Sequence, residues 1–390
     1  MEQRELPFVL MRGGTSKCIM VYERDLPPAG AQRDRALLDL FGSPDPRQID
    51  GLGGATSTTS KVCILAPSTR PDADIDYTFG QVNILLPMVE YGGNCGNCSS
   101  AVGPFAVDEG LVTAREGMTP VRIFNTNTRK LIVAEVPTHN GRASVTGDFQ
   151  IAGVPGSGAA QRLWFYDPAG SMTGKLLPTG HPVDDIEAQG RPLKVSIVDA
   201  ANPVVFVRAQ DLGMTGEELP SAIDGQPVLV ELLAEIRGKA AVLLRFVDDW
   251  RRATEVTPGV PKIAVVAPPQ PYVDIYGRPV QAEDMDLCAR AMTMGKAHAA
   301  YQLTGAIATG AAAQVPGTLV YECRAHDRRG QGAVRIGHPS GIMQVEVEMA
   351  HHDADGVDPQ SYWVVRAATY RTARRLAQGT AYLRPEIASQ

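Results

Sequence analysis

The chain has 390 residues, of which 44% are hydrophobic and 21% are charged, and its formal net charge is −6 at pH 7. This is the composition of a globular protein that is long enough for two domains. The acidic balance argues against a nucleic-acid or anionic-membrane partner, and no apolar run reaches the length of a membrane span.

The first half of the sequence favours short strands with few helices. Apolar and β-branched runs predict strands at 6–12, 61–67, 75–86, 121–137 and 142–150. A polar turn within 124–130 divides the fourth run, which predicts a hairpin. Helical patterns occur at 33–41 and at 97–110, where Gly110 ends the helix.

The second half begins after a loop-rich stretch at 155–190 and repeats the same order of elements. We expect strands at 193–213, 261–269 and 317–323, and helices at 226–244, 283–302 and 304–317. In each half a small-residue helix follows a strand and a turn. This repeat predicts two similar α+β domains, at 1–186 and 187–390, with a ligand held between them.

Cys95 and Cys98, in the stretch GGNCGNCSSAVGPFA, allow three interpretations. A zinc half-site needs a second cysteine or histidine pair at metal spacing, and none follows in the sequence, so we expect no metal. A thioredoxin-like pair belongs in a βαβ unit, whereas these strands indicate an antiparallel meander. In the third interpretation Cys95 lies at a helix N-terminus, where a thiol is activated. The alternative is that Cys95, like Cys98, is a small packing residue.

Further candidates come from glycine-rich turns. Asn94, Gly96 and Asn97 would let backbone N–H groups bind a carboxylate. Lys61 ends a loop of glycines and hydroxyl residues and opens an apolar strand, where a desolvated lysine can act as a base. A solvated surface lysine is the alternative. The loop lacks the GxxxxGK[ST] pattern, so nucleotide binding is not indicated.

Other groups could hold an anion at similar turns. Arg12, Thr15 and Ser16 follow a strand and offer donors to a carboxylate, although a plain glycine turn would have the same sequence. In the second half, Met294 and Gly295 open the segment MGKAHAAY, and Ser340 lies in the turn GHPSG.

Several motifs occur together in one order. They are MRGGTSK, QIDGLGGATSTTSKV, NCGNCSSAVGPFA, PKIAVVAPP, MGKAHAAY, PGTLV, GHPSG and RTARRL. This set, from about residue 7 to about residue 384, resembles the PrpF family of 2-methylaconitate cis-trans isomerases, 3-methylitaconate Δ-isomerases and 4-oxalomesaconate tautomerases. The resemblance implies a diaminopimelate-epimerase-like α+β fold, with two pseudo-symmetric domains that each wrap a mixed sheet around a central helix.

The resemblance also implies a chemistry. Racemising members of that fold use one cysteine from each domain, but the second position here, near Thr304, carries none. The family instead implies Lys61 and Cys95 as the acid/base pair of a cofactor-independent isomerase, with the polar groups named above holding the carboxylates. We expect a 3-methylitaconate or 2-methylaconitate type of substrate, and Lys61 as the base. The direction of proton transfer stays open from the residues alone.

Alternative functions are a 4-oxalomesaconate tautomerase, a non-catalytic tricarboxylate-binding accessory protein, and a two-base epimerase that would need Cys288 in the cleft. No signal or transit peptide is indicated, and the six scattered cysteines suggest free thiols, so we expect a cytoplasmic protein. A homodimer is the default expectation for its assembly.

Overall fold

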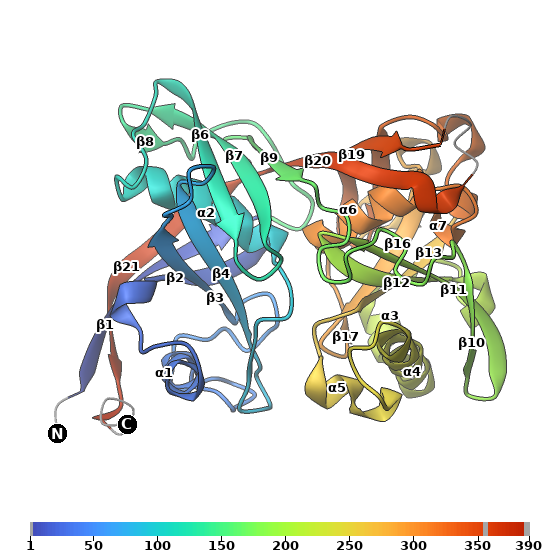
Figure 1. Cartoon of the computed structure of the whole chain (residues 1–390), viewed down its shortest axis with the longest axis horizontal. Helices are drawn as coiled ribbons and strands as arrows, with labels where there is room; N and C mark the ends of the chain where they lie inside the picture. Colours follow the sequence, from blue (N-terminus) through green and yellow to red (C-terminus); the bar gives the residue numbers. More distant parts are fainter. Residues whose placement is uncertain (1–2, 354–357, 386–390) are drawn as a thin grey trace. The chain divides into compact units, whose positions relative to one another are not determined.

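The structure is a computed structural model that describes residues 3–353 and 358–385, and the chain divides into two compact units (Figure 1). Unit 1 comprises Met1–Leu163 and Tyr370–Gln390, and unit 2 comprises Trp164–Thr369. This division differs from the predicted boundary between 186 and 187. Unit 2 starts earlier, and the last strand of the chain returns to unit 1.

Unit 1 contains most of the first half of the chain and its final strand. Its elements are β1 (Arg4–Gly13), β2 (Ser16–Tyr22), η1 (Glu23–Asp25), α1 (Ala31–Phe41), β3 (Lys61–Pro67), β4 (Ile75–Val82), β5 (Val89–Glu90), α2 (Gly96–Asp108), β6 (Gly117–Asn125), β7 (Lys130–His139), β8 (Arg142–Ala143) and β21 (Ala373–Leu383). The chain passes from one unit to the other within β9 (Gln161–Tyr166) and again at the end of β20 (Tyr362–Arg371).

Unit 2 is formed by the continuous middle of the chain. Its strands are β10 (Asp184–Ala188), β11 (Arg191–Ala200), β12 (Asn202–Arg208), β13 (Lys262–Ala267), β14 (Tyr272–Val273), β15 (Pro279–Val280), β16 (Leu287–Thr293), β17 (Lys296–Ala297), β18 (Ala333–His338) and β19 (Gly341–His351). Its helices are η2 (Gln210–Leu212), α3 (Pro220–Asp224), α4 (Pro227–Leu243), η3 (Trp250–Arg252), α5 (Ala253–Val256), η4 (Ala282–Asp284), α6 (Leu303–Ala312), α7 (Leu319–Cys323), η5 (His326–Arg328) and η6 (Pro359–Ser361).

The two units repeat one strand order, as the sequence predicted. In unit 1 the neighbours are β21-β1-β2-β3-β4-β6-β7, joined in turn by antiparallel, antiparallel, parallel, antiparallel, parallel and antiparallel pairings. In unit 2 the neighbours are β10-β11-β12-β13-β16-β18-β19, with the same succession of pairings. In each unit a central helix precedes the strand that completes the second parallel pair: α2 precedes β6, and α6 precedes β18. Each unit is therefore a mixed sheet around a helix.

Close packing of the central helices requires a glycine in each. In unit 1, a Cβ atom on Gly103 of α2 would lie 2.8 Å from both Ala134 and Val136 of β7. In unit 2, a Cβ atom on Gly310 of α6 would lie 2.8 Å from both Val345 and Val347 of β19. Each glycine is the eighth residue of its helix. The two helices are thus equivalent in both position and packing.

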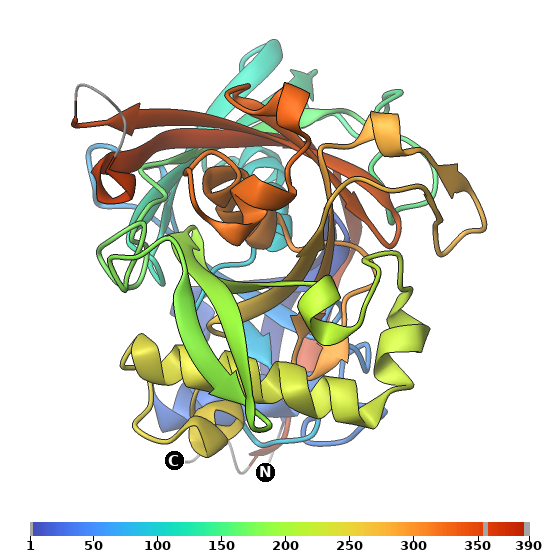
Figure 2. The same ribbon diagram turned by 90° about the vertical axis from the view of Figure 1, so that its right-hand side faces the viewer.

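An outer helix covers the opposite face of the sheet in each unit. In unit 1, α1 packs its Leu37 and Phe41 against Ile19, Val62 and Ile64 of β2 and β3. In unit 2, leucines and alanines of α4 cover the outer face of β11, β12 and β13. Figure 2 shows α4 as the long yellow-green helix and α6 in orange among the strands of this unit. The outer helices leave the other sheet face to α2 and α6.

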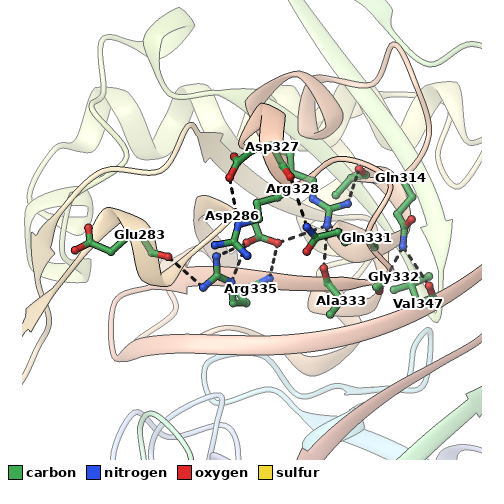
Figure 3. Close-up of polar contacts among 12 residues, drawn as sticks. Glu283, Asp286, Gln314, Asp327, Arg328, Gln331, Gly332, Ala333, Arg335 and Val347 are labelled. Carbon is green, nitrogen blue, oxygen red and sulfur yellow. Dashed lines mark hydrogen bonds and ion pairs between the residues drawn. The ribbon is translucent and has the colours of Figure 1, made fainter.

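A buried ion network in unit 2 connects β16, β18 and the end of α7. Asp286, directly before β16, receives a hydrogen bond of 2.9 Å from Nε of Arg335 (Figure 3). It also lies 3.5 Å from Nη2 of Arg324. Asp286 and Arg324 are each 1% exposed. Arg324 also donates to the backbone oxygens of Gln331 and Ala333, at 3.0 and 2.8 Å. One carboxylate therefore balances two guanidinium groups inside this unit.

The structure corrects three of the element predictions. Residues 283–302, expected to be helical, contain β16 and β17, because fully buried strands lack the polar alternation that marks a half-buried strand. Residues 317–323, expected to be a strand, contain α7, which Thr318 caps by accepting from the Tyr321 N–H. The stretch 142–150 is a strand only at β8. In the described part of the chain, no helix is long and apolar enough to cross a membrane.

Candidate active site

The turn between β1 and β2 lies directly against the first turn of α2. A Cβ atom on Gly13 would be 2.3 Å from the backbone oxygen of Asn97, and one on Gly14, whose φ is +50°, would be 2.1 Å from Oδ1 of Asn97. Only glycine permits this approach. Nδ2 of Asn97 donates to Oγ1 of Thr15 at 3.0 Å. The structure thus brings Thr15 and Asn97 together, with the buried Ser16 next to Thr15 in the chain; a role for them in binding a carboxylate stays a prediction.

Cys95 occupies the N-cap position of α2, where the third interpretation of the sequence placed it. Its backbone is extended, with φ −113° and ψ 97°, and its carbonyl accepts from the N–H of Ser99 at 2.9 Å. Oγ of Ser99 donates to Oδ1 of Asn94 at 3.2 Å, which ties the preceding turn to the helix. Cys95 is partly exposed, whereas Asn94 and Gly96 are buried. The positive end of the helix dipole acts at this position.

Lys61 is the first residue of β3 and its side chain is buried, with only 8% of the residue exposed. Its Nζ donates to Oε1 of Gln81 at 2.6 Å and lies 5.1 Å from the centre of the Phe79 ring. Nε2 of Gln81 donates in turn to the backbone oxygen of Ser60 at 2.9 Å. Gln81 therefore presents a fixed oxygen to the amine, and the surface-lysine alternative does not apply.

Strand register places Lys61 on the sheet face that α2 covers. Residue Lys61 pairs with Gln81 and residue Cys63 with Phe79, so these side chains share one face. The opposite face of the same strands packs on α1. The Cys63 sulfur lies within 4.8 Å of the Cys98 sulfur, and the Cys98 thiol is hydrogen-bonded to the side chain of Cys95. A short chain of contacts therefore connects the strand that begins at Lys61 with the N-cap of α2.

The loop that precedes Lys61 is held by a buried glutamine. Gln48 is 2% exposed and its Oε1 accepts from the N–H of Ala55 at 2.8 Å and from Oγ of Ser60 at 2.6 Å. A Cβ atom on Gly53 would lie 2.3 Å from the Gln48 side chain. The backbone oxygen of Thr58 accepts from the N–H of Lys17 at 2.9 Å. The glycine-rich loop is thereby fixed between Gln48 and β2.

Two arginines lie near this turn, and the sequence analysis named only one of them. Nη1 of Arg12 donates to the backbone oxygens of Gly14 and Thr372, at 3.1 and 2.7 Å, so this arginine braces the turn. Arg371 was missed, although it begins the RTARRL motif. Its Nε donates to Oδ1 of Asn97 at 3.2 Å, and burial lowers its pKa to about 10. Arg371 adds a buried cation next to the first turn of α2.

The predicted residues of unit 2 lie at two turns. Met294 and Gly295, with φ of 50° and 77°, form the two-residue turn between β16 and β17. Ser340 is fully buried, and its hydroxyl donates to the backbone oxygen of Ala299. A role for these residues in binding a ligand stays a prediction. The N-cap of α6, equivalent to Cys95, is Gln302.

The missing second cysteine bears on the epimerase alternative. Cys288 is the only cysteine of β16, and it is fully buried in the core that α4 covers, away from the face of α6. Its sulfur lies 3.3 Å from Sδ of Met285. The arrangement of one cysteine per central helix, which a two-base epimerase needs, is therefore not present at the α6 N-cap.

Comparison with known proteins identifies relatives of this chain over almost its whole length. The chain is 47% identical to the 3-methylitaconate isomerase of Eubacterium barkeri over 98% of each chain. A crystal structure of methylitaconate-delta-isomerase has a TM-score of 0.78 and 45% identity, covering 100% of this chain and 98% of that one. A hydroxyproline epimerase from Agrobacterium vitis, at 12% identity, has a TM-score of 0.56 over 99% and 95% of the two chains, which confirms the epimerase-like fold. Residues 3–384 match the PrpF protein family, and the chain therefore belongs to that family.

Proposed function

We propose that this protein is an isomerase that moves or isomerises the C=C bond of a small unsaturated di- or tricarboxylate, with 3-methylitaconate as the first substrate to test. The observation that carries the proposal is the placement of Lys61 and Cys95. The buried amine of Lys61, held by Gln81, lies on the sheet face that α2 covers. The partly exposed thiol of Cys95 lies at the N-cap of that helix. The likeness to the methylitaconate isomerases supports the choice of substrate.

The reaction requires one group that takes a proton and one that returns it. In our assignment, Nζ of Lys61 takes the proton from the carbon next to the C=C bond, and the electron pair spreads into the double bond and its carboxylate as a dienolate. The Cys95 thiol then gives a proton to the far carbon of the original double bond. No electrons enter or leave, so the proposed steps need no redox cofactor. Acid and base groups of this kind typically contribute ~10²- to ~10⁴-fold each.

The first turn of α2 can stabilise the charge that develops. Backbone N–H groups at a helix N-terminus have no partner within the helix and point along its axis. Such donors, fixed before the reaction begins, favour an oxyanion. Arg371 adds a positive charge on the same turn, through its hydrogen bond to Asn97. We assign the substrate carboxylates to this turn, with Thr15 and Ser16 beside it. Asn97 then positions both Thr15 and Arg371.

The test is proton exchange followed by NMR in D₂O with a panel of unsaturated di- and tricarboxylates. Wild type should introduce deuterium into 3-methylitaconate and shift its double bond. Lys61→Met should abolish both exchange and isomerisation. Cys95→Ser should still exchange the proton that Lys61 removes, but form product at least ~100-fold more slowly. Wild-type rates in both variants would refute the assignment, and the reverse pattern would exchange the two roles.

The same panel separates the alternatives. A 4-oxalomesaconate tautomerase would act on its oxo acid and leave 3-methylitaconate unchanged. A non-catalytic accessory protein would bind a tricarboxylate in calorimetry and exchange no proton in any acid. We further expect the protein to act in the cytoplasm as a homodimer, which fractionation and sedimentation would test.

A further inference from the structure

Three cysteines from three elements meet inside unit 1. Cys18 lies on β2, Cys63 on β3 and Cys98 on α2, and all three are 0% exposed. Their sulfur atoms lie within 4.8 Å of one another, and no other group of three or more His, Cys, Asp or Glu side chains in the described residues is arranged in this way. The proposed isomerisation uses none of the three.

The sheet register explains why the three thiols converge. Met20 of β2 pairs with Cys63, so Cys18, two residues earlier, lies on the same face as Cys63. This is the face that α2 covers. Cys98 is the third residue of α2, and its sulfur lies between this helix and the sheet, next to those of Cys18 and Cys63. The sequence argument against zinc considered only cysteine and histidine pairs that are close in sequence, and the fold adds two thiols from separate strands.

The spacing of the sulfurs suits a bound ion. A Zn–S bond of about 2.3 Å places the sulfurs around one ion about 4 Å apart. The three sulfurs are already within 4.8 Å, so small side-chain rotations would bring them to these distances. Thiolate ligands select soft ions, and a set of three without an oxygen or nitrogen ligand disfavours magnesium, calcium and manganese.

Tyr77 supplies an independent indication of a ligand. Tyr77 is fully buried, and its hydroxyl has no hydrogen-bond partner among the residues that the structure describes. It lies on β4 two residues from Phe79, the partner of Cys63, so it shares the face of the thiols. An unpaired buried hydroxyl destabilises the folded protein, and a bound group that accepts its hydrogen bond would offset this cost.

A cluster of neutral thiols is the simplest alternative. All three thiols are buried, and burial favours the neutral, protonated form of a thiol. Such thiols pack as small apolar groups. This alternative accounts for the three cysteines, but it leaves the Tyr77 hydroxyl without a partner. A thiolate held by a metal accepts a hydrogen bond, which the hydroxyl can donate.

We propose that Cys18, Cys63 and Cys98 form a buried site for one soft d¹⁰ metal ion, Zn(II) or Cu(I), and that the Tyr77 hydroxyl donates a hydrogen bond to a metal-bound thiolate. Binding forms three metal–sulfur bonds and releases the three thiol protons to solvent. The proposal does not depend on the isomerase function.

The test uses the full-length protein, reduced and freed of metal with a chelator. Samples receive Zn(II), Cd(II) as a spectroscopic probe for Zn(II), or Cu(I) under anaerobic reducing conditions, and are then desalted. Wild type should retain about one ion per chain by mass spectrometry of the metal, and Cd(II) should give a thiolate charge-transfer band in the ultraviolet. Competition of the Zn(II)-loaded and Cu(I)-loaded proteins with a chelator gives the affinity for each ion, and the two affinities identify the preferred one.

Variants give the test its controls. Cys63→Ala should retain no ion, whereas Cys323→Ala, which removes a buried thiol of unit 2, should bind like wild type. Tyr77→Phe keeps all three thiols and should weaken binding ~10-fold or more, as loss of a group that orients a metal ligand does. If Cys63→Ala does not fold, Cys18→Ser replaces it. Wild type that retains none of the three ions, or equal retention in wild type and the cysteine variant, overturns the proposal. A negative result in this metal-binding test does not affect the proton-exchange test, and therefore does not affect the isomerase proposal.

Discussion

Gln81 should determine where the amine of Lys61 points. Nζ donates to Oε1 of Gln81 at 2.6 Å in a buried setting, and the Gln81 amide is itself held by Ser60. The amine becomes charged as it takes the proton, and a hydrogen bond to a charged group contributes about 1.5–3 kcal/mol. Since ~1.36 kcal/mol corresponds to a tenfold change in rate, Gln81→Met should reduce kcat by ~10- to ~150-fold. Gln81 does not touch the reacting carbon in our assignment, so KM should change little.

The assay is deuterium incorporation into 3-methylitaconate, with kcat and KM measured separately and folding followed by thermal denaturation. Gln314→Leu is the matched control, because Gln314 also donates from Nε2 to a backbone oxygen, that of Val347 at 3.1 Å, but does so in unit 2. The control should lose some stability and keep wild-type kcat. A Gln81→Met enzyme that folds normally and has wild-type kcat would refute the positioning role.

Three further predictions concern stability. Gly103→Ala should lower the free energy of unfolding by about 1–3 kcal/mol in urea titrations, since the added methyl overlaps β7, and an unchanged midpoint would contradict this packing. Asp286→Ala leaves the charges of Arg324 and Arg335 unbalanced and should cost about 3–5 kcal/mol, whereas loss of an exposed pair such as Arg70–Asp72 should cost under ~1 kcal/mol. Burial raises the pKa of the Cys323 thiol to about 11. The contribution of this protonated thiol to the free energy of unfolding is therefore complete below pH 9 and is lost as the pH rises toward 11. Between pH 9 and 10 wild type should lose about 1 kcal/mol more than Cys323→Ala in reducing urea titrations, and parallel pH profiles would exclude the effect.

Local patterns in the sequence were sufficient for the elements with one dominant signal. The run 61–67 coincides with β3, and the helix expected near Cys95 is present as α2. β16 was predicted as a helix because its buried alanines, Met292 and Arg290 lack strand alternation. Its pairing with a strand on either side decides its structure. β21 was missed because most of its side chains are exposed, so no apolar face marks it.

The site was predictable only where its residues share one motif. Cys95 and its neighbours follow from the rules for helix ends, and Lys61 follows from its place between a glycine-rich loop and an apolar strand, while the family resemblance implied their pairing. Gln81 and Arg371 could not be found in this way, since Gln81 meets Lys61 across the β3–β4 pairing and Arg371 reaches Asn97 from the other end of the chain. The same reason hid the meeting of Cys18, Cys63 and Cys98, because strand register and helix docking must be known before their sulfurs can be placed together.

The return of the last strand to unit 1 has a consequence for synthesis on the ribosome. β1 pairs along its whole length with β21, from Arg4 with Leu383 to Gly13 with Ala373. Unit 2 is one continuous segment and can fold as soon as it has emerged. Unit 1 has to wait for the final residues, with the partner edge of β1 exposed in the meantime. The domain that begins first is therefore completed last, and premature termination near residue 370 should leave unit 2 folded while unit 1 becomes a target for chaperones and proteases.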